Sequence, residues 1–296
     1  MKQRLVTLLF ALALVLALAT TGGGEEAGPR GTKSGFVTTP DDVRIHYLEA
    51  GKQVGEKKAP AILLVPGWTM PAWIWEKQIE HFSKMTRVVA MDPRAQGQST
   101  KTTEGLYPEA RARDIKAVVD QLHLAPVVLV GWSMAVNEVA SYVSQFGNDS
   151  VAGIVLVDGG VYFEDSLIAG ILKYAGTMMK DRPAKTEAFV RNMYRKPQSE
   201  EYLKRVTAAS LETPTAQAMA LFVGSMSTDN RSALAKFARP TLMVITKSPF
   251  DSASFEMLKR IPGARLEQFD DAGHALFVDD PERFNALLDG FLQALP

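Results

Sequence analysis

Short apolar runs that alternate with helical patterns are the feature that most constrains the fold of this chain. A continuous run rich in Val, Ile and Leu is typical of a strand that is buried on both faces of a sheet. Such strands, alternating with helices, predict a mostly parallel sheet flanked by helices. We expect strands within residues 43–51, 61–67, 87–99, 127–131, 151–160, 240–246 and 264–274, and the clearest helices at residues 107–124 and 281–295.

One long interval breaks this alternation. Between Gly160 and Ala238 there is no convincing strand, whereas runs such as DSLIAGILKYAGTMMK and PTAQAMALFVGSM have helical patterning. We therefore expect residues 159–238 to form a helical cap over the edge at which the strands end. The core would then comprise residues 36–158 and 239–296.

A serine at the end of one strand is the first candidate for chemistry. The stretch GWSMA places Ser133 between the apolar run at residues 127–131 and a helix-like run. Ligands of parallel sheets bind outside the carboxyl ends of the strands, and a tight strand–turn–helix exposes a serine oxygen there. That turn is crowded, so the small residues Gly131 and Ala135 fit its flanks. The alternative is a serine that only caps the helix.

A nucleophilic serine needs a base, and the chain has four histidines. His274 follows the last expected strand and precedes the final helix, which places it at the same edge of the sheet as Ser133. His46 lies in an early strand, whereas His81 and His123 lie within or at the end of helices. We interpret these three as structural and His274 as the candidate base.

Composition excludes several functional classes. Lys plus Arg and Asp plus Glu both number 33, so the net charge of zero favours neither nucleic acid nor an anionic membrane surface as a partner. The chain has no cysteine, which excludes disulfides, thiolate metal sites and a cysteine nucleophile. A hydrophobic content of 46% supports a sizeable core.

The first residues resemble a secretory signal peptide. Lys2 and Arg4 precede an apolar run at residues 5–18, and the ALA stretch ending at Ala19 fits a small-residue cleavage site. We expect a cleaved signal at residues 1–19 and a secreted or periplasmic protein without stable membrane association. The alternative is an uncleaved N-terminal membrane anchor. Residues 20–35 are Gly-rich and indicate a flexible leader.

Four motifs together resemble the α/β-hydrolase superfamily over roughly residues 36–296: LLVPGW, MDPRAQGQS, GWSMA and DAGHALFVDDPERF. The resemblance implies an eight-stranded, mostly parallel sheet with a helical cap. It also implies that Ser133 attacks a carbonyl carbon and that His274 takes the serine proton. The backbone N–H groups of Met134 and Trp68 would stabilise the oxyanion. No metal or organic cofactor is implied.

The acid of the expected catalytic triad departs from the usual family pattern. The family places it a few residues after the strand that follows the cap, but Pro249 stands at that position and Thr246 replaces the usual glycine. Asp251 lies two residues late and could also cap a helix. Some members instead place the acid at the end of the preceding strand, where this chain has Asp158. We favour Asp158, with Asp251 as the alternative.

The resemblance implies a serine hydrolase that cleaves a carboxylic ester, or a related acyl bond, of a small-molecule substrate through an acyl-enzyme. A serine in place of aspartate argues against haloalkane dehalogenase and epoxide hydrolase chemistry. One alternative is a cofactor-free perhydrolase of the non-haem haloperoxidase kind. Another is a ligand-binding protein with vestigial activity, which the displaced acid would suit. Oligomeric state is not predicted.

Four apolar residues are candidate substrate contacts. Trp132 and Trp73 lie close to the serine and oxyanion motifs, and Met219 and Phe222 lie in the cap. Aromatic side chains and methionines line apolar pockets but also pack in cores, so packing is the alternative for each of them. We expect a small or medium apolar acyl group as the default substrate.

Overall fold

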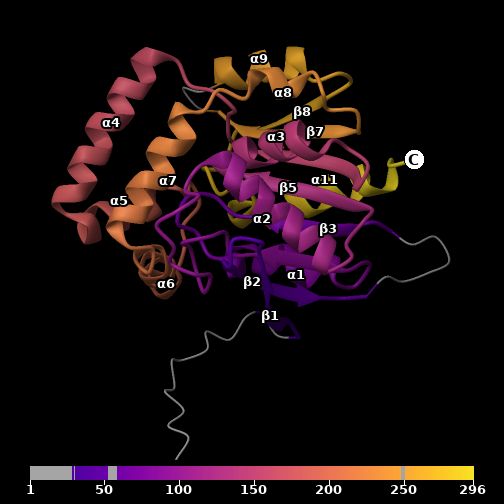
Figure 1. Ribbon diagram of the computed structural model, residues 1–296, viewed down its shortest axis with the longest axis horizontal. Coiled ribbons are helices and arrows are strands. Elements are labelled where there is room, and N and C mark those ends of the chain that lie inside the picture. The colour runs from indigo at the N-terminus through magenta and orange to yellow at the C-terminus, as the bar shows by residue number, and fades with distance from the viewer. Residues whose placement is uncertain (1–28, 30, 53–58, 248–250) are drawn as a thin grey trace, which may run out of the picture.

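An eight-stranded sheet forms the centre of the molecule (Figure 1). The computed structural model describes residues 29, 31–52, 59–247 and 251–296. The strands are β1 (Lys33–Thr38), β2 (Arg44–Ala50), β3 (Ala61–Val65), β4 (Val88–Met91), β5 (Val127–Trp132), β6 (Val151–Val157), β7 (Thr241–Thr246) and β8 (Arg265–Phe269). Their order is β1-β2-β4-β3-β5-β6-β7-β8, and only the pairs of β1 with β2 and β2 with β4 are antiparallel. The predicted mostly parallel sheet is confirmed.

Helices cover both faces of this sheet and explain why the central strands are apolar throughout. One face packs against α1 (Glu76–Phe82), α10 (Leu276–Asp279) and α11 (Pro281–Gln293). The other face packs against α2 (Pro108–Gln121), α3 (Ala135–Phe146) and α9 (Asp251–Arg260). Every residue of β3 and β5 is buried as a result, as expected for strands enclosed between two helical layers.

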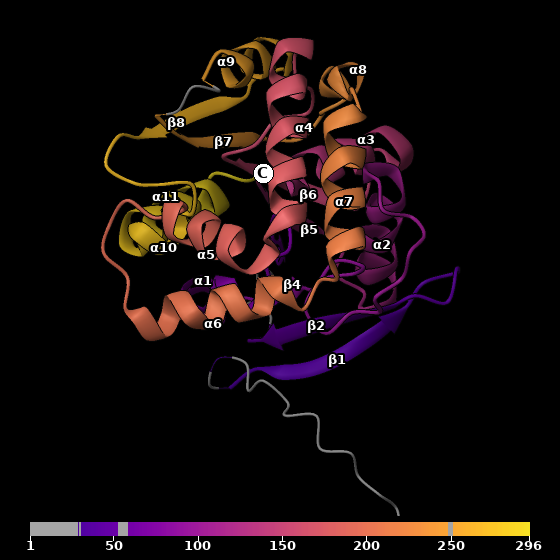
Figure 2. The same ribbon diagram turned by 90° about the vertical axis from the view of Figure 1, so that its left-hand side faces the viewer.

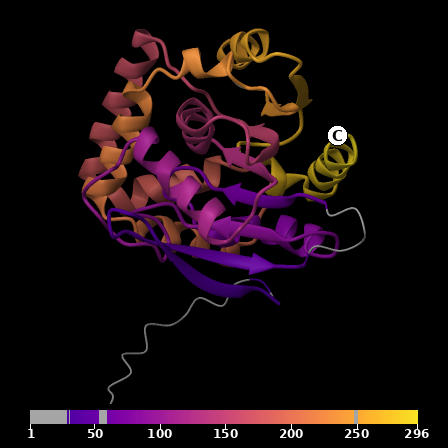
Figure 3. The ribbon, with the colours of Figure 1, turned by 45° about the vertical axis from the view of Figure 1, so that its right-hand side comes forward.

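The interval between β6 and β7 is helical in the part of the chain that the structure describes. Its helices are α4 (Asp165–Lys180), α5 (Arg182–Asn192), α6 (Glu200–Leu211), α7 (Thr215–Ser227) and the short α8 (Arg231–Leu234). Helices α4 and α7 run side by side (Figure 2). The cap helices and the C-terminal helix α11 lie at opposite sides of the molecule (Figure 3).

Two boundaries differ from those expected from the sequence. Strand β1 begins at Lys33, so the last residues of the expected leader belong to the sheet. Helix α8 packs against α3 and α9, and Leu234 and Phe237 join the core cluster on that face. The cap therefore ends near Thr228 rather than at residue 238, because the segment after α7 returns to the core.

The expected signal peptide at residues 1–19, and most of the expected leader, lie outside the described residues. Among the residues that are described, no helix combines the length and the apolar character needed to cross a membrane.

Candidate active site

Ser133 lies in a tight turn between β5 and α3, at the edge where the parallel strands end. Its φ of 57° is in the left-handed region, which is uncommon for a residue other than glycine. The turn is closely packed, because a Cβ at Gly131 would lie 2.8 Å from the carbonyl oxygen of Ala135. A larger residue than glycine at position 131 would therefore displace the start of α3.

A chain of hydrogen bonds joins Ser133 to two residues that are distant in sequence. His274 Nε2 lies 2.9 Å from Ser133 Oγ, and His274 Nδ1 lies 2.7 Å from Asp158 Oδ2. An ionised carboxylate can only accept hydrogen bonds, so the ring proton is on Nδ1. The lone pair on Nε2 then faces the serine hydroxyl, which is the arrangement a general base requires.

The second oxygen of Asp158 is held by Thr246, the residue that stands where the family usually has a glycine. Thr246, the last residue of β7, donates from its backbone N–H and from Oγ1 to Asp158 Oδ1, at 2.9 and 3.0 Å. The Asp158 N–H in turn donates to the carbonyl of Val244 at 2.8 Å. The Thr246 hydroxyl, at the end of β7, therefore supports the Asp158 carboxylate at the end of the neighbouring strand β6.

The structure brings Asp158, of the two candidate acids, to the imidazole. Asp251 is the first residue of α9, and its side chain lies outside the described part of the chain, as does Pro249. The Nδ1 position of His274 is taken by Asp158 Oδ2. This geometry supports the choice of Asp158 made from the sequence.

The loop that carries His274 is fixed by the core and by the segment between α5 and α6. Trp132 Nε1 donates to the carbonyl of His274 at 2.9 Å, and the two rings lie 5.2 Å apart. Asp279 Oδ2 accepts from the N–H groups of Gly273 and Arg195, both at 2.7 Å. Trp132 is 1% exposed, so it packs beneath the histidine rather than forming the substrate contact we expected.

The two expected oxyanion donors flank the serine. Met134 directly follows Ser133, and Gly67 approaches so closely that a Cβ there would lie 2.9 Å from Ser133 Cβ. This places the peptide bond between Gly67 and Trp68 beside the serine side chain. Within the described residues, neither the Met134 N–H nor the Trp68 N–H donates a hydrogen bond, so both remain open to a ligand.

An apolar cluster lies between these donors and the cap. Trp68 and Met134 belong to it together with Met219 of α7. The ring of Phe222 packs against the cluster, with its centroid 5.2 Å from that of Trp68. The two cap residues chosen from the sequence therefore pack beside the loop that carries Trp68.

Trp73 belongs to a different environment from the one we expected. It is 4% exposed, and its ring contacts the Arg205 guanidinium, which lies 3.7 Å from the ring centroid, and the ring of Tyr202, whose centroid is 6.3 Å away. Burial is the main cause that raises the pKa of Tyr202 to about 12. Trp73 is part of the core cluster on the α1 and α11 face, so the structure assigns it to packing rather than to substrate contact.

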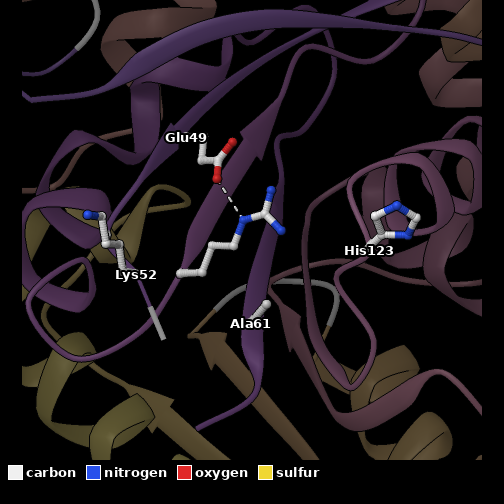
Figure 4. Close-up of a pocket in the computed structure, with 6 residues that line it drawn as sticks. Glu49, Lys52, Ala61 and His123 are labelled. Atoms are coloured by element: carbon white, nitrogen blue, oxygen red, sulfur yellow. Dashed lines mark hydrogen bonds and ion pairs between the residues drawn. The ribbon is translucent and has the colours of Figure 1, made fainter. Parts of the chain in front are cut away.

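A separate surface pocket lies away from this site (Figure 4). Its walls include Ala61, the first residue of β3, and Arg87, which immediately precedes β4. Arg87 pairs with Glu49 at 2.6 Å. The pocket is therefore at the edge where the strands begin, opposite to Ser133, and His123 at its rim has no part in the serine site.

The other two histidines have structural partners. His46 is buried and bonds to Asp92 at 2.7 Å and to Ser34 at 2.8 Å, whereas His81 pairs with Asp289 at 2.8 Å. In the described part of the chain there is no cluster of three or more His, Asp or Glu side chains that could hold a metal ion.

Several known proteins are similar to this chain in sequence or in fold. A bifunctional esterase/perhydrolase of Acinetobacter calcoaceticus is 40% identical over 124 residues, which cover 42% of this chain and 44% of that protein. An esterase from Exiguobacterium antarcticum superposes with a TM-score of 0.80 at 22% identity, covering 90% of this chain and all of the other. A bromoperoxidase from Bacillus anthracis superposes with a TM-score of 0.81 at 23% identity, covering 88% of this chain and all of the other.

The two solved structures show likeness of fold, and the match to the Acinetobacter protein spans less than half of its length. A broader match comes from the sequence pattern of the Alpha/beta hydrolase family, which covers residues 62–287 and so includes Ser133, Asp158 and His274. This chain is a member of the Alpha/beta hydrolase family.

Proposed function

We propose that the protein hydrolyses carboxylic esters with a small or medium apolar acyl group, with Ser133 as nucleophile. The observation that carries this proposal is the hydrogen-bonded chain from Ser133 through His274 to Asp158, at the carboxyl edge of the sheet beside an apolar cluster. The bifunctional esterase/perhydrolase among the relatives supports an acyl-transfer reaction.

The geometry suits a two-step reaction. Ser133 Oγ attacks the ester carbonyl carbon while His274 Nε2 takes the hydroxyl proton, and Asp158 stabilises the imidazolium that forms. The oxyanion accepts from the Trp68 and Met134 N–H groups. Collapse of this intermediate passes the proton to the leaving alcohol and forms an acyl-serine. Water, deprotonated by His274, then releases the carboxylic acid and restores the serine.

Ser133→Ala tests the proposal directly. We expect it to lower the kcat for p-nitrophenyl butyrate by about 10⁴-fold or more, because the nucleophile is lost while the fold is kept. Stoichiometric labelling by a fluorophosphonate should disappear with it. Ser144→Ala, on the same helix α3 but without a place in the hydrogen-bonded chain, is the matched control. Ester hydrolysis within tenfold of wild type in Ser133→Ala would reject the proposal.

Perhydrolysis is the second candidate, favoured by the same relative. The acyl-serine would pass its acyl group to hydrogen peroxide instead of water, which yields a peracid and the free serine. Peracid-dependent bromination of monochlorodimedone, measured in acetate with peroxide, would detect this reaction and should also depend on Ser133. A protein that binds ester analogues but neither turns them over nor reacts with the fluorophosphonate would instead be a binding protein with vestigial activity.

A further inference from the structure

Gln96 lies at the centre of a buried polar network that the serine chemistry above does not use. It belongs to the tight turn after β4, between Ala95 and Gly97, which both have positive φ values. Its side chain is fully buried, and its Nε2 donates to the carbonyl oxygens of Gly67 and Met70, both at 3.0 Å. Those carbonyls belong to the loop that carries Trp68.

The orientation of the Gln96 amide is fixed by its partners. Arg111 Nη1 lies 3.1 Å from Gln96 Oε1, and a guanidinium can only donate. The carbonyls of Gly67 and Met70 can only accept. The amide oxygen must therefore face Arg111 and the amide nitrogen must face the loop, because the flipped arrangement would leave all three contacts unfavourable.

The contact with Gly67 helps to hold the direction of one peptide unit, whose carbonyl also accepts from the Met70 N–H at 3.2 Å. The carbonyl of Gly67 and the N–H of Trp68 belong to the same planar peptide bond, which is trans, so the two groups point in opposite directions. When Gln96 holds the carbonyl on one side, the N–H is directed to the other. Ser133 is next to this peptide, because a Cβ placed on Gly67 would lie only 2.9 Å from the Cβ of Ser133.

The network also reaches the helix that carries the second oxyanion donor. Arg111, on α2, pairs with Glu138 on α3 at 2.6 Å, and both side chains are almost fully buried. Glu138 is four residues after Met134 on the same helical path. Burying a charged pair costs free energy, and this pair links the partner of the Gln96 amide to helix α3.

We propose that Gln96 is a positioning residue for the oxyanion hole, holding the Gly67–Trp68 peptide so that the Trp68 N–H faces the developing charge at Ser133. Arg111 and Glu138 fix the amide in turn and connect it to α3. This inference rests on the proposed ester hydrolysis. It assigns Gln96 no contact with the substrate, only an effect through the backbone of the loop.

Gln96→Met tests the inference, because methionine has a similar length but no donor. We expect kcat per active site to fall about ten- to hundredfold, below the 10²–10³-fold of a deleted oxyanion donor, since the N–H is misdirected but present. KM should change less than threefold. The inhibition constant of phenylboronic acid, which forms a tetrahedral adduct, should rise by a similar factor to the loss in kcat.

Two further variants separate positioning from folding. Gln78 is equally buried and donates to the carbonyl of Phe277 and to Asn285, both at 3.0 Å, so Gln78→Met removes a comparable amide elsewhere. It should lower the melting temperature while leaving kcat per titrated site and boronate inhibition unchanged. Gln96→Glu keeps a partner for Arg111 but cannot donate to the loop when ionised, so it should behave like Gln96→Met.

The outcomes are distinct. If Gln96→Met or Gln96→Glu retains wild-type kcat and boronate affinity per active site, the inference is wrong. It is also wrong if kcat falls while boronate affinity is unchanged, or if only the fraction of active sites falls. When Ser133→Ala abolishes hydrolysis in the same assay, such results reject the role of Gln96 alone; retained activity in Ser133→Ala rejects the proposed function itself.

Discussion

The carboxylate of Asp158 is restrained at both oxygens, and this restraint would allow it to serve as the acid although it lies on a different strand from the usual one. One oxygen bonds to His274, and the other accepts two bonds from Thr246. The φ of Asp158 is 42°, in the left-handed region that residues other than glycine seldom adopt, and the surrounding contacts stabilise it. Because β6 and β7 are parallel neighbours, their ends can share this one carboxylate.

Asp158→Asn should therefore cripple turnover, whereas Asp251→Asn should not. The asparagine can donate its amide to the imidazole, which favours the wrong tautomer and leaves the cationic ring unsupported; the loss in kcat should approach 10⁴-fold. Asp251→Asn, a matched change at the start of α9, should cost less than threefold. Both are measured with p-nitrophenyl butyrate at pH 7 and pH 9. The reverse ranking would show that the loop before α9 delivers the acid.

At the same scale, the sequence led to the expectation that Ser133, His274 and Asp158 meet, since each lies just after an expected strand at one edge of the sheet, and the three side chains are hydrogen-bonded in the structure. It did not predict Gln96 or the role of Thr246. Their partners come from other strands: Gln96 contacts the loop after β3, and Thr246 contacts the end of β6. No local pattern encodes such contacts, which depend on the order of strands in the sheet. The predicted contact role of Trp132 failed because strand residues beneath the turn are enclosed by the core.

Among the elements, two parts of the cap contact the site in different ways: the segment that joins α5 to α6, and helix α7. The former holds the histidine loop, because Asp279 accepts from Arg195 and the Ala275 N–H donates to the carbonyl of Met193 at 3.1 Å. Helix α7 contacts the oxyanion loop instead: Trp68 Nε1 donates to the carbonyl of Ala218 at 2.7 Å. The cap is thus bonded to the loop that carries Trp68 and to the loop that carries His274.

Cap residues on α7 should determine acyl length. Met219→Ala and Phe222→Ala remove side chains that pack with the cluster around Trp68, so space for a longer acyl chain should open. We expect the ratio of kcat/KM for p-nitrophenyl octanoate over acetate to rise about tenfold, within the range for a few methylenes in an apolar pocket. Val223→Ala, on the exposed side of the same helix, is the control. An unchanged ratio with a lower melting temperature would assign both residues to packing alone.

The element boundaries show where periodicity fails as a guide. Strand β1 was missed because it is an edge strand, with Val37 as its single fully buried residue and no alternation to detect. Helix α8 is four residues long, too short to separate it from the cap by pattern. The long interior strands and α2 were predicted to within a few residues, because enclosure on both faces leaves continuous apolar runs.

For the whole molecule, the order of the strands sets the order of the chemical groups. Six neighbouring parallel strands, in the sheet order β4, β3, β5, β6, β7 and β8, each carry a residue of the proposed site at their carboxyl end or in the loop that follows. The corresponding residues are Gln96, Trp68, Ser133, Asp158, Thr246 and His274. A single sheet edge therefore aligns the residues to which we assign oxyanion support, nucleophile, acid and base, although the segments are far apart in sequence.

The remaining prediction concerns where this molecule works. Lys2 and Arg4 followed by an apolar run of residues 5–18 match an export signal, and the run is shorter than the roughly 20 residues of a spanning helix. We propose cleavage after Ala19 and release of the rest of the chain. Expressed in a bacterial host, the exported protein should have the intact mass expected for a chain that starts at Thr20.

A variant at the expected cleavage site, Ala19→Phe, is the control for this prediction. A signal peptidase needs a small side chain immediately before the cut, so Ala19→Phe should leave the apolar run attached and hold the chain at the membrane. Esterase activity should then move from the periplasmic fraction to the membrane fraction, while the activity per active site is unchanged because the serine site is built from residues after Lys33. If the unmodified chain already keeps Met1 and remains in the membrane fraction, residues 5–18 act as a permanent anchor and the proposal of cleavage is wrong.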